Sequence, residues 1–322
     1  MVQRFRCRTC HRTFSEQTFR TSYWLKRPDL LAPVFHRLQG GSGYRQIGRE
    51  FGVSPQTILG LAARLGRHCL LYFQSQRPPG IEEPVALDSF QSFEYSQDHP
   101  TLFHLVTGSN SHFTYGFTDS ELRRSGRRTE AQKRRCARIE RRFGRPNPRA
   151  TREDVAAVLA IVAPRAQRLT LHSDEHQEYP RAIRSLHHLA VDHRTISSRA
   201  ARTSRNPLFP VNLLDLLIRH SGANHKRETI AFSKRRQGAS ERLWIFLVWR
   251  NWMKSFSERK RDATPAMRAG LADRALTFDV LVERRLFPAH WPLPKRWEAY
   301  YTRSIPTRRI PRIATHRLRY AF

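Results

Sequence analysis

The feature that most constrains this chain is its excess of positive charge. Its 322 residues include 58 Lys and Arg against 27 Asp and Glu, which gives a formal net charge of +31. Such a chain is drawn to polyanions before any specific contact is made. Hydrophobic residues still make up 39% of the sequence, so a packed core can form. We therefore expect a folded protein that binds nucleic acid.

Membrane and secretory roles are not expected. The longest apolar run, residues 243–249, is far shorter than the ~20 residues that span a bilayer. No apolar leader follows the N-terminus, and four Cys, only two of them close together, do not indicate a disulfide framework. The sequence therefore predicts a protein of the reducing cytoplasm, which in a bacterium also contains the DNA, so that the protein would be associated with the nucleoid when bound to DNA.

Residues 1–20 carry Cys7 and Cys10 at the spacing of a zinc knuckle, in which two thiolates hold one ion. Tetrahedral Zn²⁺ needs four ligands, and His11 is too close to Cys10 to be a comfortable third. The second pair of a zinc ribbon normally lies upstream. We expect that this half was lost or that the native chain begins before Met1. A Zn²⁺ site and a metal-free partial ribbon both stay open.

Residues 21–73 are expected to form a helix-turn-helix domain. Apolar residues recur at helical spacing, Gly52 supplies a turn, Ser54 is placed to cap the next helix, and Pro55 suits its first position. The alternative is a helical hairpin without DNA contact. If the second helix enters the major groove, the residues expected at DNA are Arg45, Gln46, Ser54, Gln56, Thr57 and Arg64.

The remainder of the chain divides into a linker over residues 74–84, a main domain over 85–256 and a basic C-terminal tail over 257–322. The main domain begins with three strand-like runs, which are most simply antiparallel, and a basic helical stretch over 120–150. A buried strand ending at Asp174 follows, then a helix over 175–189 and a mostly helical region. In that region Trp244, Trp249 and Trp252 are expected to pack in the core.

Two apolar strands, Ala86-Leu-Asp88 and Leu169-Thr-Leu-His-Ser-Asp174, each carry an Asp at or near one end. If these strands are neighbours, the two carboxylates meet at one edge of the sheet. Paired carboxylates can hold Mg²⁺ or Mn²⁺ ions that serve the attacking and leaving oxygens of a phosphodiester. Taken alone, each Asp could equally cap a helix or form a turn.

The order of these parts resembles the DDE transposases of bacterial insertion sequences. The resemblance rests on the partial zinc ribbon, the helix-turn-helix, the run Leu87-Asp-x-Phe-x-Ser-Phe93, the run Ser173-Asp-x-x-x-x-Tyr179 and the element Phe232-Ser-Lys234. It implies an α/β fold, with an RNase H-like mixed sheet flanked by helices and preceded by a small all-α DNA-binding domain. It also implies Asp88 and Asp174 as catalytic carboxylates, DNA recombination at terminal inverted repeats as the activity, and a homo-oligomer.

The third carboxylate departs from the family pattern. That pattern places a Glu about twenty residues before Phe232, where this chain has Asn212. Asp215 lies one helical turn further on and could replace the Glu as third ligand, or it could be a surface acid. More distant alternatives are Glu228 and Glu241.

Three hypotheses follow for the function. The chain is an active transposase that cuts and joins DNA with Mg²⁺, a transposase-derived DNA-binding protein without catalysis, or a basic regulator in which the two Asp are incidental. Nicking activity separates the first two, and the fold of residues 85–250 separates the third.

Overall fold

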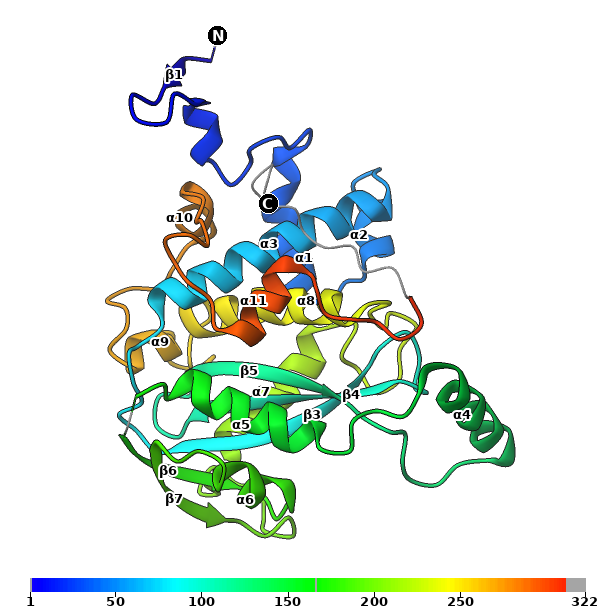
Figure 1. Ribbon diagram of the computed structural model, residues 1–322. Coiled ribbons are helices and arrows are strands. Elements are labelled where there is room, and N and C mark those ends of the chain that lie inside the picture. Colours follow the sequence, from blue (N-terminus) through cyan, green and yellow to red (C-terminus); the bar gives the residue numbers. More distant parts are fainter. Residues whose placement is uncertain (1, 166, 311–322) are drawn as a thin grey trace.

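A five-stranded mixed sheet forms the centre of the computed structural model, which describes residues 2–165 and 167–310 (Figure 1). The strands are β3 (Val85–Phe93), β4 (Pro100–Gly108), β5 (Thr114–Glu121), β6 (Gln167–Ser173) and β7 (Leu189–Thr195). Their order is β5-β4-β3-β6-β7. The first three form an antiparallel meander, and β6 and β7 continue the sheet parallel to β3. This order and these directions confirm the expected RNase H-like α/β fold.

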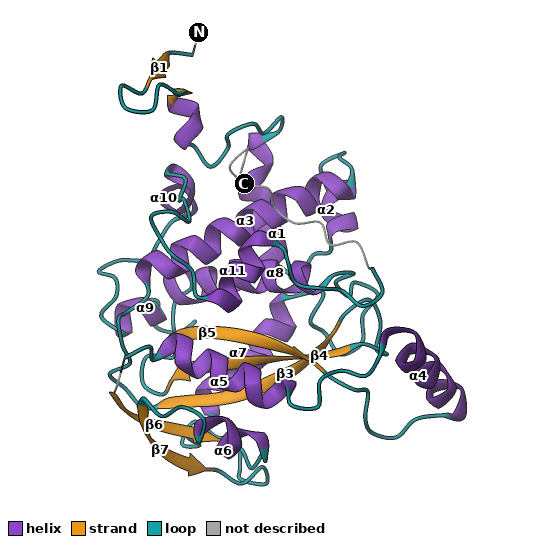
Figure 2. Cartoon of the chain, in the orientation of Figure 1, coloured by secondary structure: helices purple, strands orange, loops and turns teal. Residues whose placement is uncertain are grey.

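Helices cover both faces of this sheet (Figure 2). Helix α5 (Ala150–Val162) packs on β4 and β5, and α6 (Glu178–Ile183) lies beside α5. Helix α7 (Phe209–Ser221) packs behind β3 and β4, and α8 (Arg236–Val248) continues that layer. Because side chains alternate along a strand, neighbouring residues of β3 face different helix layers.

One strand was not expected from the sequence. The predicted helix over residues 175–189 is wrong: α6 is short, and the chain then enters β7. The segment Leu189–Thr195 adds to the sheet by pairing in parallel with β6, from Gln167 opposite Leu189 to Ser173 opposite Thr195. The sequence gives little sign of this strand because most of its residues are at least partly exposed. An edge strand is stabilised mainly by backbone hydrogen bonds to its neighbour, which leave no side-chain pattern.

The N-terminal part consists of a β-hairpin, two single-turn helices and three α-helices. Strands β1 (Arg4–Arg6) and β2 (Thr13–Ser15) pair antiparallel, and the single-turn helices η1 (Glu16–Phe19) and η2 (Pro28–Leu30) follow. The three helices are α1 (Leu31–Gln39), α2 (Tyr44–Glu50) and α3 (Pro55–Gln76).

The expected turn between α2 and α3 is confirmed. Gly52 adopts a left-handed φ of 62°, and the Oγ of Ser54 accepts a hydrogen bond from the backbone N–H of Gln56 at 3.2 Å. Gly48 allows α2 to approach this turn, because a Cβ there would lie 2.8 Å from the carbonyl oxygen of Val53. The helix cap and the turn that were predicted from the local sequence are therefore both present.

Helix α3 ends at Gln76, close to the expected domain boundary at residue 73, and packs against the main domain. Its second half is almost wholly buried, and it packs closely along α8. At the crossing, Gly66 meets the backbone of Glu241. The helix-turn-helix and the sheet domain thus share one apolar core, so residues 74–84 connect two parts of a single packed unit.

This crossing provides a paired test of the shared core. In Gly66→Ala, the new Cβ would lie 2.6 Å from the carbonyl oxygen of Glu241, and we expect a loss of about 1–3 kcal/mol in unfolding free energy. In Gly60→Ala on the same helix, nothing lies within 4 Å, and the gain in helix propensity should stabilise by about 0.5–1 kcal/mol. Urea denaturation measures both. Equal effects of the two substitutions would contradict the close packing of α3 on α8.

The expected C-terminal tail folds back onto the core as far as it is described. A π-helical turn η3 (Trp249–Met253) is followed by α9 (Pro265–Arg268), α10 (Phe278–Glu283) and α11 (Lys295–Thr302). Trp297 is fully buried, and its indole N–H donates to the carbonyl oxygen of Phe117 in β5 at 2.9 Å. This segment is therefore packed against the sheet, although its basic, Pro-interrupted sequence shows no clear helical or strand pattern. Residues 311–322 of that tail lie outside the described residues.

The aromatic cluster behind the sheet confirms one further expectation. Trp244 and Trp252 are both 1% exposed, and both make edge-to-face contacts with the ring of Phe73 of α3. Trp249 is partly buried against the same core. These rings therefore pack inside the protein. Among the residues described, no helix combines the length and apolar character needed to cross a membrane.

Candidate active site

Asp88 and Asp174 lie at adjacent positions in the sheet. The parallel pairing of β3 with β6 ends where Leu87 lies opposite Ser173, and the next residue on each strand is one of the two acids. The parallel strand order therefore brings together two carboxylates that are 86 residues apart in the sequence. Both are partly buried.

The carboxyl group of Asp88 is held in an environment that favours its protonated form. Its pKa is raised to about 6, chiefly by burial and also by the nearby charges of Asp174 and Asp215, although a 2.6 Å hydrogen bond from the backbone N–H of Ser89 and the charge of Arg202 act in the opposite direction. The effect of Asp174 and Asp215 on Asp88 indicates that both acids lie in its electrostatic neighbourhood. A raised pKa of this kind is common where carboxylates are gathered for catalysis or metal binding.

Asp215 reaches this neighbourhood from α7. It forms an ion pair with Arg219 at 3.1 Å, one helical turn along. Burial raises its pKa although Arg219, Arg227 and Arg202 act in the opposite direction. Arg219 is itself fixed, because it donates to the carbonyl oxygens of Gln91 at 3.2 Å and His225 at 3.3 Å.

The other candidates for a third acid are placed differently. Asn212 is half-buried one turn before Asp215 on α7. Glu228 is exposed in the loop after that helix. Glu241 lies in the α3–α8 interface, where it forms an ion pair with Arg303 at 2.9 Å and burial raises its pKa. Of these acids, Asp215 is near enough to raise the pKa of Asp88, whereas Glu241 is buried in a different interface.

A hydrogen-bonded chain on the opposite face of the sheet fixes β3 beside the site. The hydroxyl of Ser89 lies 2.6 Å from Nδ1 of His104 and 2.8 Å from the hydroxyl of Tyr179 on α6, and Nε2 of His104 lies 2.6 Å from Oγ of Ser120. Burial lowers the pKa of His104 to about 3, so the ring is neutral. The sequence indicated Tyr179 through its motif but carried no signal for His104 or Ser120.

Two arginines that the sequence analysis did not identify act on the carboxylates. Arg202 lies in the exposed loop after β7, and its charge acts on both Asp88 and Asp215. Arg227 is exposed after α7 and acts on Asp215. Guanidinium groups beside carboxylates at a sheet edge are suited to hold a phosphate.

The residues expected to contact DNA differ in their exposure and in their hydrogen bonds within the protein. Arg45, Gln56 and Thr57 are exposed on α2 and at the start of α3. Gln46 is exposed too, although its Oε1 accepts the N–H of Gly43 at 2.7 Å and caps α2.

Ser54 and Arg64 have clear structural tasks. Ser54 caps α3, and Arg64 donates to the carbonyl oxygens of Thr21 at 3.0 Å and Tyr23 at 2.7 Å. Arg64 is thus directed into the protein and away from the exposed start of α3, which corrects its expected place.

The N-terminal hairpin places Cys7 and Cys10 in one tight turn. The N–H of Cys7 donates to the carbonyl oxygen of Arg12 at 2.8 Å, and His11 has a left-handed φ of 55°. Hydrogen bonds from the backbone N–H groups of Cys10 and Thr9 lower the pKa of the Cys7 thiol. Among the described residues, no group of three or more His, Cys, Asp or Glu is arranged to hold a metal ion, here or at Asp88.

No protein-family model and no curated protein matches this sequence. Among solved structures, the chain is similar to a chain in the cryoEM structure of the simian T-cell lymphotropic virus intasome in complex with PP2A regulatory subunit B56 gamma. The TM-score is 0.26 and the identity 12%, with 82% of this chain and 76% of that chain covered. A score this low does not establish a common fold. The RNase H-like assignment therefore rests on the order and directions of the strands.

Proposed function

We propose that this chain is a DNA transposase of the DDE type, which cleaves and joins DNA strands at the ends of an insertion sequence. One observation carries the proposal. Asp88 and Asp174 end the paired segments of two adjacent parallel strands in an RNase H-like sheet, and Asp215 approaches them from a helix. The strong net positive charge and the exposed start of α3 support DNA as the substrate.

The proposed metal site uses Asp88 and Asp174 as ligands for Mg²⁺ or Mn²⁺. Carboxylate oxygens suit these hard cations, and the pKa of Asp88 is raised by its burial and, to a smaller extent, by the charges of Asp174 and Asp215. When bound, such ions activate the attacking oxygen and stabilise the leaving oxygen of a phosphodiester. Asp215 would join only by giving up its ion pair with Arg219.

The chain's own basic residues would position the DNA. Arg202 and Arg227 lie where a phosphate beside the carboxylates would need counter-charges, and Arg219 would keep Asp215 in place until DNA arrives. The exposed residues Arg45, Gln56 and Thr57 would hold the terminal repeat. Cleavage at two ends of an element would require at least two copies of the chain.

A second candidate function is DNA binding without catalysis. The specific observation that favours it is the third acid, because Asn212 stands at the expected Glu and Asp215 is paired with Arg219. In a protein of this kind the basic surface would be retained and the metal site would be incomplete.

Nicking of supercoiled DNA in Mg²⁺ or Mn²⁺ tests the proposal. We expect Asp88→Ala and Asp174→Ala each to lower the rate by about a thousandfold, since a metal contributes several kcal/mol to the transition state. The matched control is Asp192→Ala on β7, which removes a carboxylate paired with Arg194 at 2.8 Å and should leave the rate unchanged. Asp215→Ala reports whether this acid serves as the third ligand.

The outcomes separate the candidate functions. Loss of nicking in Asp88→Ala and Asp174→Ala, but not in Asp192→Ala, supports the transposase. A parent protein that binds DNA but does not nick it, with either metal, supports DNA binding without catalysis. A parent that does not bind DNA would overturn both.

A further inference from the structure

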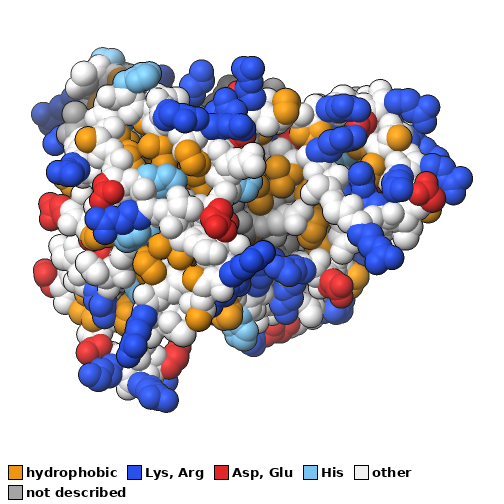
Figure 3. Space-filling view, turned by 90° about the horizontal axis from the view of Figure 1, so that it is seen from below, with side chains coloured by type: hydrophobic (Ala, Val, Ile, Leu, Met, Phe, Trp, Pro, Cys, Tyr) orange, Lys and Arg blue, Asp and Glu red, His pale blue; other side chains and the backbone are white. Residues whose placement is uncertain are grey.

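The strongest charged surface outside the candidate site is helix α4 (Glu130–Phe143), which projects from the molecule at the right of Figure 1. It is inserted between β5 and α5, and it makes few contacts with other helices. Figure 3 shows Lys and Arg side chains gathered at the corresponding end of the molecule. Packing against the rest of the protein therefore does not explain why this helix projects and carries so many basic residues.

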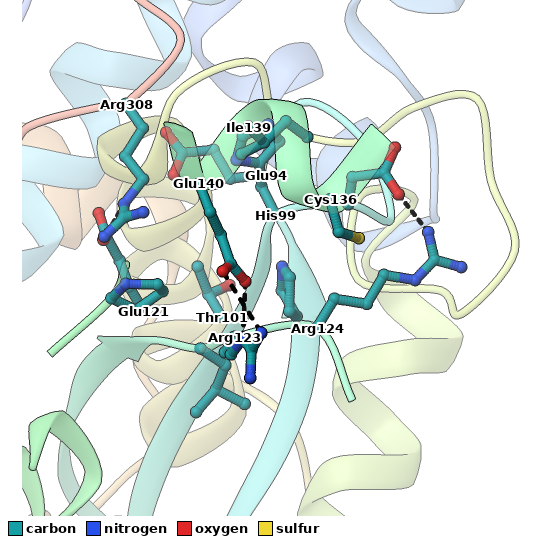
Figure 4. Close-up of a pocket in the computed structure, with 14 residues that line it drawn as sticks. Glu94, His99, Thr101, Glu121, Arg123, Arg124, Cys136, Ile139, Glu140 and Arg308 are labelled. Atoms are coloured by element: carbon teal, nitrogen blue, oxygen red, sulfur yellow. Dashed lines mark hydrogen bonds and ion pairs between the residues drawn. The ribbon is translucent and has the colours of Figure 1, made fainter. Parts of the chain in front are cut away.

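The inner side of α4 explains how it is held. Asp98, whose side chain is 8% exposed, forms ion pairs with Arg124 and, at 2.7 Å, with Arg135. Glu140 pairs with Arg123 at 2.6 Å and with Arg145 at 3.0 Å. Figure 4 shows Glu140 and its neighbours between α4 and the ends of the strands. Two acids thus pair with the four arginines at the base of the helix and offset part of their charge.

The outer side of α4 carries arginines that these acids do not reach. They lie at i, i+4, i+7 and i+8 along one face, which we call the outer arginine face, and all four are exposed: Arg134, Arg138, Arg141 and Arg142. None has an acidic partner among the described residues; Arg142 lies over the ring of Phe143 at 5.1 Å. The face spans roughly 12 Å of helix axis at 1.5 Å per residue.

The strand β5, after which α4 follows in the chain, ends at the same end of the sheet as the carboxyl end of β3. Strand β5 ends at Glu121, opposite Thr101, which pairs with Ser92. Ser92 lies four residues beyond Asp88 along β3, roughly 13 Å at 3.3 Å per residue. Helix α4 therefore projects beyond the carboxyl end of the strand that carries Asp88. DNA lying across the carboxylates would continue towards this helix.

We propose that the outer arginine face of α4 is a second DNA-binding surface, which contacts the phosphate backbone of the double-stranded DNA outside the segment held by the helix-turn-helix. The inference rests on the proposed function in that DNA is taken as the substrate. Four guanidinium groups without acidic partners fit a row of phosphates, which carry one charge per ~1.7 Å of duplex. Because phosphates carry no base identity, this surface would bind any sequence.

The test measures binding of a 30-base-pair duplex of arbitrary sequence by fluorescence anisotropy, in EDTA, over a range of salt concentrations. The variant replaces Arg134, Arg138, Arg141 and Arg142 with Gln, which keeps helix propensity. The matched control loses the same charge from exposed residues around α9 and α10, on the other side of Figure 1, by replacing Arg259, Lys260, Arg274 and Arg284 with Gln.

We expect the α4 variant to weaken DNA binding by about tenfold or more and to lower the slope of log affinity against log salt by about 2–4, while the control changes little. Thermal unfolding of both variants checks that they fold like the parent. Equal losses in the two variants, or an unchanged slope in the α4 variant, would overturn the proposal. Retained DNA binding with lost binding to polyglutamate would instead identify an acidic protein as the partner.

Because the assay contains no divalent metal, it does not depend on cleavage. A parent that nicks DNA, with an α4 variant of unchanged salt slope, contradicts the second surface alone. A parent that never nicks DNA, with a reduced slope in the variant, contradicts the transposase alone.

Discussion

Replacing Asp88 with Asn is expected to abolish metal-dependent cleavage and to make the protein more stable at pH 8. Burial raises the pKa of this carboxyl group to about 6, against 3.8 for an ordinary Asp. The ionised form is therefore disfavoured in the folded protein, and a difference of about two pH units corresponds to at most about 3 kcal/mol. Asn fills nearly the same space and carries no charge. We expect a gain of about 1–3 kcal/mol in unfolding free energy at pH 8.

The sign of this effect depends on pH. Well below pH 3.8 the carboxyl group is protonated in both the folded and the unfolded chain, so parent and Asp88→Asn should have equal stability. As pH rises towards 6, the unfolded chain loses its proton first and the parent loses stability relative to the variant. Above 6 the difference stays constant.

Urea denaturation at pH 4 and pH 8 measures this difference, with Asp192→Asn on the edge strand β7 as control. A gain for Asp88→Asn that is equal at both pH values would contradict a buried, ionised carboxylate. Nicking by the parent should also increase as pH rises through about 6, because only the ionised carboxylate is a metal ligand. A rate that is flat from pH 5 to 8 would argue against Asp88 as that ligand.

The second large effect is expected at Asp119 in β5, where the C-terminal segment is attached to the sheet. Its side chain is fully buried and accepts hydrogen bonds from Arg236 at 2.8 Å and from the hydroxyl of Tyr300 at 2.6 Å. Burial alone would raise its pKa, but the charges of Arg236 and Arg296 hold the pKa below its ordinary value. Asp119→Ala would leave a buried guanidinium short of its partner, and we expect a loss of about 3–5 kcal/mol.

Chemical denaturation of Asp119→Ala and of Glu298→Ala checks this expectation. Glu298 is an exposed acid on α11, the same helix as Tyr300, and its removal should change the unfolding free energy by less than about 0.5 kcal/mol. A loss below 1 kcal/mol in Asp119→Ala would mean that Arg236 is satisfied by Glu121, with which it already pairs at 3.0 Å. In that case α11 would not depend on Asp119 for its attachment.

Local signals explain what could be predicted of the fold. The turn at Gly52 and the cap at Ser54 depend on residues within a few positions of each other, so the sequence alone is enough to place them. The same is true of β3 and β6, in which apolar residues recur at short spacing along the strand. The missed strand β7 and the buried segment around Trp297 have no such local pattern, because each is stabilised by partners far away in the chain.

The candidate site divides in the same way. The motifs pointed to Asp88, Asp174 and Tyr179, and the register of β3 with β6 agrees with pairing the two acids. The supporting residues could not be predicted. His104 contacts Ser89 across two neighbouring strands. The residues next to His104 in the sequence do not distinguish it from the other His residues of the chain.

Short-range periodicity, capping and composition are enough to predict helices α2 and α3, the two Asp-bearing strands and the excess of positive charge. Only the tertiary structure decided which acids share a site and which basic residues are neutralised. Asp215 rather than Glu241 approaches Asp88, and Arg64 is directed into the protein while the outer arginine face of α4 is not. These outcomes depend on distances between residues that are remote in sequence, and such distances are set by how the helices pack against one sheet.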